Sequence, residues 1–76
     1  MSRLMKEKGI FSRIKYCEKF TAKRNENNNF EVTFAYMKTP GYMLQSKVGG
    51  VRQFLRLNGV QKWMEKMGVE QFKVIL

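Results

Sequence analysis

Apolar and polar residues alternate in the segment that begins at Ile10. The even-numbered positions as far as Phe20 are mainly apolar, whereas several odd-numbered positions carry Lys or Arg. A period of two is typical of a half-buried β-strand, so we expect a strand over residues 10–24. A helix can also be drawn through this segment, because four apolar residues recur at helical spacings: Ile10, Ile14, Cys17 and Phe20.

An asparagine-rich cluster, NENNN at residues 25–29, separates this segment from a second alternating one, FEVTFAYMK. Asn tolerates the left-handed backbone conformation and can bond its own backbone, so the cluster predicts a turn. Two alternating segments around a turn predict a β-hairpin. One face of its second strand would hold Phe30, Val32, Phe34 and Tyr36. Pro40 and Gly41, in TPGY, are expected to end that strand.

The hydrophobic spacing changes to threes and fours after Ser46, which predicts two short helices. Their apolar faces would hold Val48, Val51, Phe54 and Leu55 in the first helix, and Val60, Trp63, Met64 and Met67 in the second. Asn58 is the expected N-cap of the second helix, with Gln61 completing a capping box, and Gly68 is its expected left-handed end. Alternation returns in residues 70–76, which predicts a last strand.

The order of these elements predicts one small α+β domain spanning residues 1–76. A three-stranded antiparallel sheet would form from the β-hairpin and the last strand, with the two helices on one face. Residues 1–9 are polar and mostly basic, and we expect them to form a flexible arm or one helical turn. The uncovered face of the sheet would present a row of basic side chains: Arg13, Lys15, Lys19 and Lys23.

Charge indicates the kind of partner. The chain of 76 residues holds 15 Lys and Arg against 6 acidic residues, which gives a formal net charge of +9. Uncompensated positive charge destabilises a compact state by self-repulsion and attracts polyanions. Nucleic acid is therefore the partner that the composition favours.

Catalysis and metal binding are disfavoured by what the sequence lacks. The chain has no His and no Asp, and its Glu residues are scattered, so we expect no enzyme activity, no metal site and no cofactor. Cys17 would need an activating base to act as a nucleophile, and neighbouring Lys15 or Lys19 would lower its pKa slightly. The lone Cys, the missing signal peptide and the missing membrane span predict a cytoplasmic protein.

Two short motifs have a phosphate-binding and a structural interpretation. VGGV, residues 48–51, allows backbone amides near an anion, with Lys47 beside them, or allows close packing of a helix start. Residues 57–60, LNGV, resemble the hairpin of helix-hairpin-helix modules, in which Gly59 and Val60 would supply amides and Lys62 a charge. Gln61 stands where that family has its second hairpin glycine, so an ordinary helical hairpin is the other interpretation.

We expect sequence-independent binding of nucleic acid, with single strands favoured because phosphates and ring stacking supply the affinity. The predicted contacts are Arg13, Lys15, Lys19, Lys23 and Arg24, with Lys47, Arg52, Arg56 and Lys62 as a second patch. Phe11 and Tyr42 are the candidate stacking rings. The alternative is a non-enzymatic module that docks on a helicase, polymerase or host factor, with Trp63 or Met43 as an apolar anchor.

The Lys- and Asn-rich stretch KRNENNNFEVTFAY, in a short chain without His, resembles the small basic accessory proteins of T-even phages. These include the one encoded beside the UvsW recombination helicase. The resemblance implies a role in phage DNA recombination, repair or replication, in the host cytoplasm, by binding single strands or by contacting the helicase. It assigns no functional residue.

Overall fold

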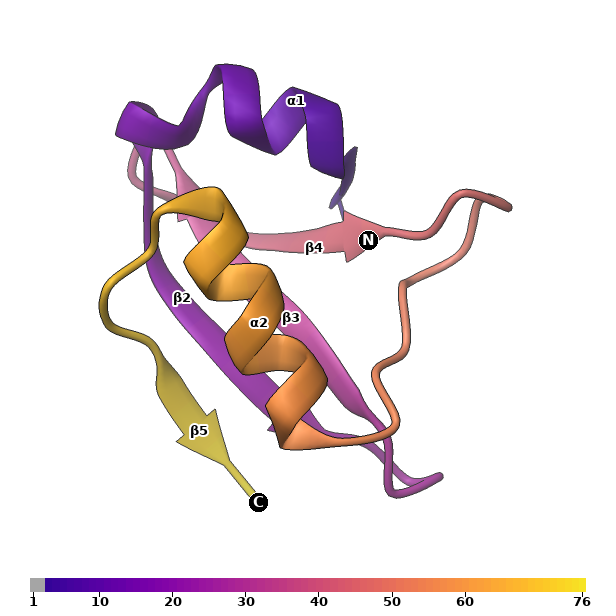
Figure 1. Ribbon diagram of the computed structural model, residues 1–76. Coiled ribbons are helices and arrows are strands. Elements are labelled where there is room, and N and C mark those ends of the chain that lie inside the picture. Colours follow the sequence, from indigo (N-terminus) through magenta and orange to yellow (C-terminus); the bar gives the residue numbers. More distant parts are fainter. Residues whose placement is uncertain (1–2) are drawn as a thin grey trace.

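The computed structural model describes residues 3–76, which form a mixed sheet with helices on one side (Figure 1). The elements are β1 (Arg3–Lys6), α1 (Glu7–Ser12), the 3-10 helix η1 (Ile14–Tyr16), β2 (Cys17–Arg24), β3 (Phe30–Tyr36), β4 (Thr39–Gln45), α2 (Leu57–Met67) and β5 (Lys73–Ile75). The sheet has five strands in the order β1-β4-β3-β2-β5. The predicted three-stranded antiparallel sheet is wrong, because β1 and β4 are further strands and because β1 and β5 pair in parallel at the two edges.

The antiparallel hairpin of β2 and β3 confirms the predicted asparagine turn. The Asn25 side-chain oxygen accepts hydrogen bonds from the backbone N–H groups of Asn27 and Asn29, at 2.9 and 3.0 Å. Asn28 has a φ of 62°, the left-handed conformation that Asn tolerates. The turn therefore forms for the reason that its composition predicts.

The first half of the predicted strand over residues 10–24 is helical instead. Ile10 is fully buried within α1, η1 follows, and extended structure begins only at Cys17. The pairing register then shifts between Glu18 and Thr21, at a bulge where Lys19 has a φ of 56°. The regular basic face predicted from the alternation does not form, because Arg13 and Lys15 precede β2 and Lys19 lies in the bulge.

β3 and β4 are joined by two residues, Met37 and Lys38, which both have positive φ. The predicted end of the strand at Pro40 and Gly41 is wrong, since both lie inside β4. They occupy a register irregularity at which Gly41 has a φ of 94°. A bulge needs no ladder hydrogen bond from proline and accepts a left-handed glycine, so the two residues bend β4 without ending it.

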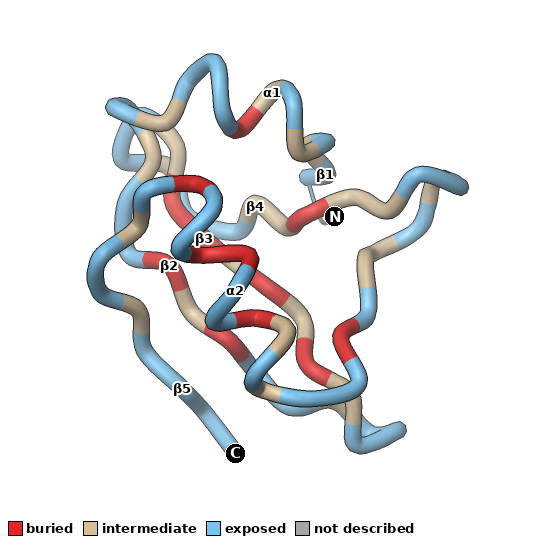
Figure 2. The backbone as a smooth tube through the Cα atoms, viewed as in Figure 1, coloured by how far each residue is buried: buried red, intermediate tan, exposed pale blue. Residues whose placement is uncertain are grey.

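α2 covers β2 and β3, and the buried residues gather between them (Figures 1 and 2). The core contains Ile10, Phe20, Ala22, Phe30, Val32, Phe34, Leu44, Phe54, Val60, Trp63, Met64 and Met67. Gly68 ends α2 with a φ of 80°, as predicted. The capping box at Asn58 is wrong: α2 starts at Leu57 with Arg56 as its N-cap and no side-chain cap. α2 has 11 residues, and no helix within residues 3–76 is long and apolar enough to cross a membrane.

Residues 46–56 form a loop rather than the first of the two predicted helices. Phe54 lies in the core and exchanges backbone hydrogen bonds with Phe30 at 2.7 and 2.9 Å. Val48 and Leu55 are 96% and 80% exposed. The apolar residues of this segment are spaced at threes and fours, but they do not lie on one face of a helix.

Candidate nucleic-acid interface

Four basic residues meet where β1 passes into α1. β1 and β4 are parallel, with Lys6 opposite Gln45, so both strands end at the same place. A hollow of about 570 Å³ lies there, which we call the basic hollow. It is lined by Lys6, Glu7, Lys8, Gln45, Ser46, Lys47 and Arg52. Residues 3–9, for which the sequence predicts a flexible arm or one helical turn, supply β1 and the start of α1. Residues 1–2 lie outside the described residues.

The far wall of the basic hollow is held by a hydrogen-bonded loop after β4. The Ser46 N–H donates to the Gly50 carbonyl at 2.7 Å, and the Gly49 N–H donates to the Ser46 carbonyl at 3.2 Å. The Gln45 side chain donates to the Gly49 carbonyl at 3.1 Å. Gly49 has a φ of 115°, which L side chains rarely adopt. These bonds fix the place at which Lys47 enters the hollow.

Glu7 is the acidic residue of the basic hollow, and its carboxylate is occupied by three donors. Lys66 Nζ donates to one oxygen at 2.9 Å, while Trp63 Nε1 and Arg52 donate to the other at 2.9 and 3.4 Å. The hydrogen bond from Lys66 is the main cause that lowers the pKa of Glu7, against a raising effect of burial. Among residues 3–76, the ion pairs of Glu7 involve Arg52 and Lys66, so Lys6, Lys8 and Lys47 keep their charges uncompensated.

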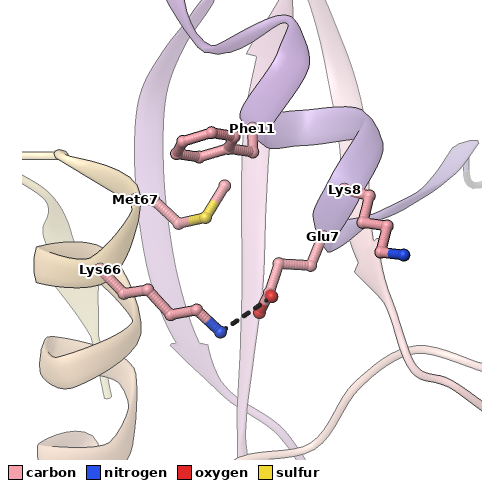
Figure 3. Close-up of a pocket in the computed structure, with 5 residues that line it drawn as sticks. All are labelled: Glu7, Lys8, Phe11, Lys66 and Met67. Atoms are coloured by element: carbon pink, nitrogen blue, oxygen red, sulfur yellow. Dashed lines mark hydrogen bonds and ion pairs between the residues drawn. The ribbon is translucent and has the colours of Figure 1, made fainter.

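A second hollow, of about 280 Å³, adjoins the first between α1 and α2, and we call it the ring hollow. It shares Glu7 and Lys8 with the basic hollow and adds Phe11, Lys66 and Met67. Figure 3 shows the Phe11 ring over the Met67 side chain, with Lys8 directed away from α2. Phe11 is 61% exposed, so its ring is available to a ligand. A cationic cavity thus meets an accessible aromatic ring.

A third hollow, of about 620 Å³, lies between β2 and β5, and we call it the edge hollow. Its lining comes from the bulge of β2 and the residues around the start of β5. These are Lys19, Phe20, Thr21, Gln71, Phe72 and Lys73.

The predicted basic residues are therefore divided among several places. Lys47 and Arg52 line the basic hollow, and Lys19 lines the edge hollow. The others lie outside all three hollows: Arg13 at the end of α1, Lys15 in η1, Lys23 and Arg24 at the end of β2, Arg56 at the N-cap of α2, and Lys62 on the exposed side of α2. The structure therefore does not gather all the members of either predicted patch in one place.

The candidate rings and anchors also separate. Tyr42 is half-buried and packs on Phe34, with ring centroids 5.8 Å apart, while Arg3 lies over its ring at 5.5 Å. Trp63 is 4% exposed and belongs to the core. Met43 is half-buried on the open face of the sheet, paired with Leu4 and with Thr33. Phe11 is thus the predicted ring whose hollow adjoins one lined by two predicted cations, Lys47 and Arg52.

Both phosphate-loop interpretations lose their structural basis. Gly49 and Gly50 precede a loop instead of a helix, so no helix start stands behind them. Gly59 and Val60 lie inside the first turns of α2, and the Gly59 N–H already donates to the Arg56 carbonyl at 3.1 Å. The resemblance to a helix-hairpin-helix module fails because residues 46–56 supply no first helix.

Cys17 is a hydrogen-bonded thiol. Its Sγ donates to the Arg13 carbonyl at 3.3 Å. Burial raises the pKa of Cys17 and outweighs the lowering effect of the Arg13 charge. The expected slight lowering by neighbouring lysines is wrong, and the thiolate that nucleophilic chemistry needs is disfavoured.

Sequence reasoning missed half of the basic hollow. Lys6 and Lys8 were assigned to an arm, because nothing local indicates that Arg3–Lys6 pairs with a strand 39 residues later. Lys66 of the ring hollow and Lys73 of the edge hollow belong to neither of the two predicted basic patches. One local feature of the sequence could have indicated the ring hollow. Glu7 and Phe11 are four positions apart, the spacing of neighbours on one face of a helix.

Comparisons of the chain with models of protein families, with curated proteins and with solved structures found no match.

Proposed function

We propose that this protein binds single-stranded nucleic acid, largely without regard to sequence, at the joined basic and ring hollows. The observation that carries the proposal is their shared wall. Glu7 and Lys8 belong to both, so a cavity with four cations opens beside a ring that is 61% exposed. A nucleotide offers the matching pair of groups, an anionic phosphate and a flat base.

Phosphate binding is the part assigned to the basic hollow. Lys6, Lys8 and Lys47 are exposed, and Arg52 is held at the edge by Glu7 and by the Phe54 ring, 4.7 Å from its guanidinium. Lysine ammonium groups bind phosphate as point charges and release condensed counterions, so affinity falls with salt. No base edge is read by such contacts, which makes them independent of sequence.

Base stacking is the part assigned to Phe11. Its ring lies over Met67, so one face packs on the protein and the rest is accessible (Figure 3). An aromatic side chain can stack on any unpaired base, for about 1–3 kcal/mol per base. In a duplex the bases are already stacked and paired, so the ring favours a single strand.

The test is fluorescence anisotropy of a labelled oligothymidylate, titrated at several salt concentrations. Phe11→Ala should weaken binding by about 1–3 kcal/mol. Lys47→Gln should lower the salt slope by about 0.7, the value for one single-strand phosphate contact. The same oligonucleotide in a duplex should bind more weakly, because its bases cannot reach the ring.

Two variants outside the hollows serve as controls. Tyr16→Ala removes another ring, 51% exposed and with Lys15 Nζ 5.4 Å from its centroid. Lys62→Gln removes one charge from the exposed side of α2. Both should bind like the unaltered protein. Equal losses from Tyr16→Ala and Phe11→Ala would mean that no defined site exists, and absence of binding at low salt would refute the proposal.

A second candidate function is docking on a helicase, polymerase or host factor. The observation in its favour is the loop over residues 46–56, which exposes Val48 and Leu55 among Lys47, Arg52 and Arg56. Apolar groups within a basic rim suit an acidic protein surface with an apolar pocket. The resemblance to T-even phage accessory proteins makes the recombination helicase the first partner to test. Leu55→Ser should abolish its binding while leaving oligonucleotide affinity unchanged.

A further inference from the structure

We infer that the edge hollow is a second phosphate subsite for the same strand, an inference that rests on the function proposed above. Its lining within residues 3–76 contains two lysines, Lys19 and Lys73, and no carboxylate. Thr21 and Gln71 add polar groups. At about 620 Å³ it is as large as the basic hollow. A strand bound at Phe11 would continue into it.

The backbone conformation of Lys19 supports this subsite. Its φ of 56° lies in the left-handed region, where an L residue other than glycine carries a cost of roughly 1–2 kcal/mol. Glycine would adopt the same bulge without that cost. Strained conformations of this kind gather at binding and catalytic sites, because the side chain there has a use. Here the residue is a lysine that lines the edge hollow.

Strand pairing supplies the second lysine. β5 is parallel to β2 and places Lys73 opposite Thr21, two residues beyond Lys19. Thr21 Oγ1 donates to the Lys19 carbonyl at 3.3 Å, which ties the bulge to the residue that pairs with Lys73. The two lysines therefore line the same hollow although 54 positions separate them in the sequence, from 19 to 73. Phe72, half-buried beside them, offers part of a second ring.

The two sites lie on either side of the C-terminal end of α2. Met67 lines the ring hollow and Gln71 lines the edge hollow, only four positions later. Four residues span at most about 14 Å, so a few nucleotides are enough to connect the sites. The chain that leaves α2 runs directly to β5, next to β2 (Figure 1). A bound strand would pass from Lys8 and Phe11 over this segment to Lys19 and Lys73.

The experiment compares two lysines in the same backbone conformation. Lys19→Gly removes a charge and relieves a φ of 56°, and Lys38→Gly removes a charge and relieves a φ of 66° in the β3–β4 turn, outside the hollows. Both variants should melt no lower than the unaltered protein. Affinities are measured by anisotropy for a thymidine dinucleotide, which is too short to reach both sites, and for an oligothymidylate of about twelve nucleotides, which lies within the common range of site sizes.

Lys19→Gly should weaken binding of the longer oligonucleotide about fivefold at about 0.1 M salt, as expected for one lost phosphate contact. It should leave the affinity for the dinucleotide unaffected, and Lys38→Gly should leave both affinities unaffected. Equal losses from the two variants, or no loss from Lys19→Gly, would overturn the second subsite while the proposed function stands. If the unaltered protein binds neither oligonucleotide, the proposed function itself fails.

Discussion

The indole Nε1 of Trp63 donates a 2.9 Å hydrogen bond to Glu7, 56 positions earlier in the chain. The same carboxylate binds Lys66 of α2 and Arg52 of the loop before it. Glu7 therefore connects α1 to α2 through a hydrogen bond and an ion pair. It also separates the basic hollow from the ring hollow, so the stability of this contact and the shape of the proposed site depend on one side chain.

Glu7→Gln should lower the melting temperature at neutral pH, because Gln keeps the shape but loses both ion pairs. The hydrogen bond from Lys66 lowers the pKa of Glu7 below its ordinary value of 4.5. A carboxyl whose pKa is lower in the folded state stabilises the fold above the unfolded pKa, and this stabilisation is lost as the pH falls through the folded pKa. The difference between the two proteins should therefore shrink below pH 4.5.

Circular dichroism melts at a series of pH values measure this difference. Glu65→Gln is the matched control, since Glu65 is an exposed carboxylate of α2 without an ion pair among the described residues. Its melting temperature should follow that of the unaltered protein. A difference for Glu7→Gln that stays constant down to pH 3 or so would show that its charge contributes nothing.

Trp63 should be protected from acrylamide in the folded protein. The ring is 4% exposed and packs near Phe20, with centroids 6.4 Å apart, so its fluorescence should be blue-shifted and weakly quenched. Unfolding in urea should raise the quenching constant to that of free tryptophan. Strong quenching before unfolding would instead place the ring at the surface and restore Trp63 as a candidate protein anchor.

The local features of the fold were predictable because local chemistry determines them. The asparagine turn after residue 24 forms through the Asn25 side chain, and the end of α2 forms through Gly68. Both depend on a residue that accepts a left-handed backbone or bonds its own neighbours. The apolar face of α2 was predictable for the same reason, since helical neighbours are near in sequence.

The edges of the sheet, and with them the proposed site, depend on contacts that are distant in sequence. β1 pairs with β4 and β5 pairs with β2, and both pairings are parallel. Parallel strands are not joined by a short turn, so no local turn sequence indicates either pairing. The basic hollow needs the first of these pairings and the edge hollow needs the second. At Ile10 the alternation was compatible with strand and helix, and burial against the core, not the local pattern, decided for α1.

Gly68→Ala should destabilise the fold by about 1–2 kcal/mol, because alanine at a φ of 80° brings its Cβ too close to the backbone. Apart from its two chain neighbours, no atom of residues 3–76 lies within 4 Å of the position where the Cβ would be, so the loss of stability reports backbone conformation and not a clash with another element. Gly50→Ala is the control, since that glycine has equal space and no positive φ. Urea unfolding should give a lower midpoint for Gly68→Ala, and equal midpoints would contradict the argument.

The turn between β3 and β4 should be open to improvement. Met37 and Lys38, with φ values of 49° and 66°, are the two residues between paired Tyr36 and Thr39. A two-residue hairpin loop of this kind requires positive φ at both positions and strongly favours Asn-Gly. The Met37→Asn, Lys38→Gly variant should therefore raise the free energy of unfolding by about 1–2 kcal/mol in urea titrations. Met37 is 65% exposed, so its replacement removes little buried surface.

The sign of the change in the free energy of unfolding distinguishes a specific benefit of glycine in this turn from a general effect of replacing lysine with glycine. Lys62→Gly makes a similar exchange at an exposed position within α2, where glycine costs roughly 1 kcal/mol of helix stability. Lysine-to-glycine substitution should therefore stabilise the protein at residue 38 and destabilise it at residue 62. If both substitutions lower the unfolding midpoint, the turn does not hold the left-handed pair in solution. The gain at residue 38 would show that the lysine is present at a conformational cost, as we argue for Lys19 in the edge hollow.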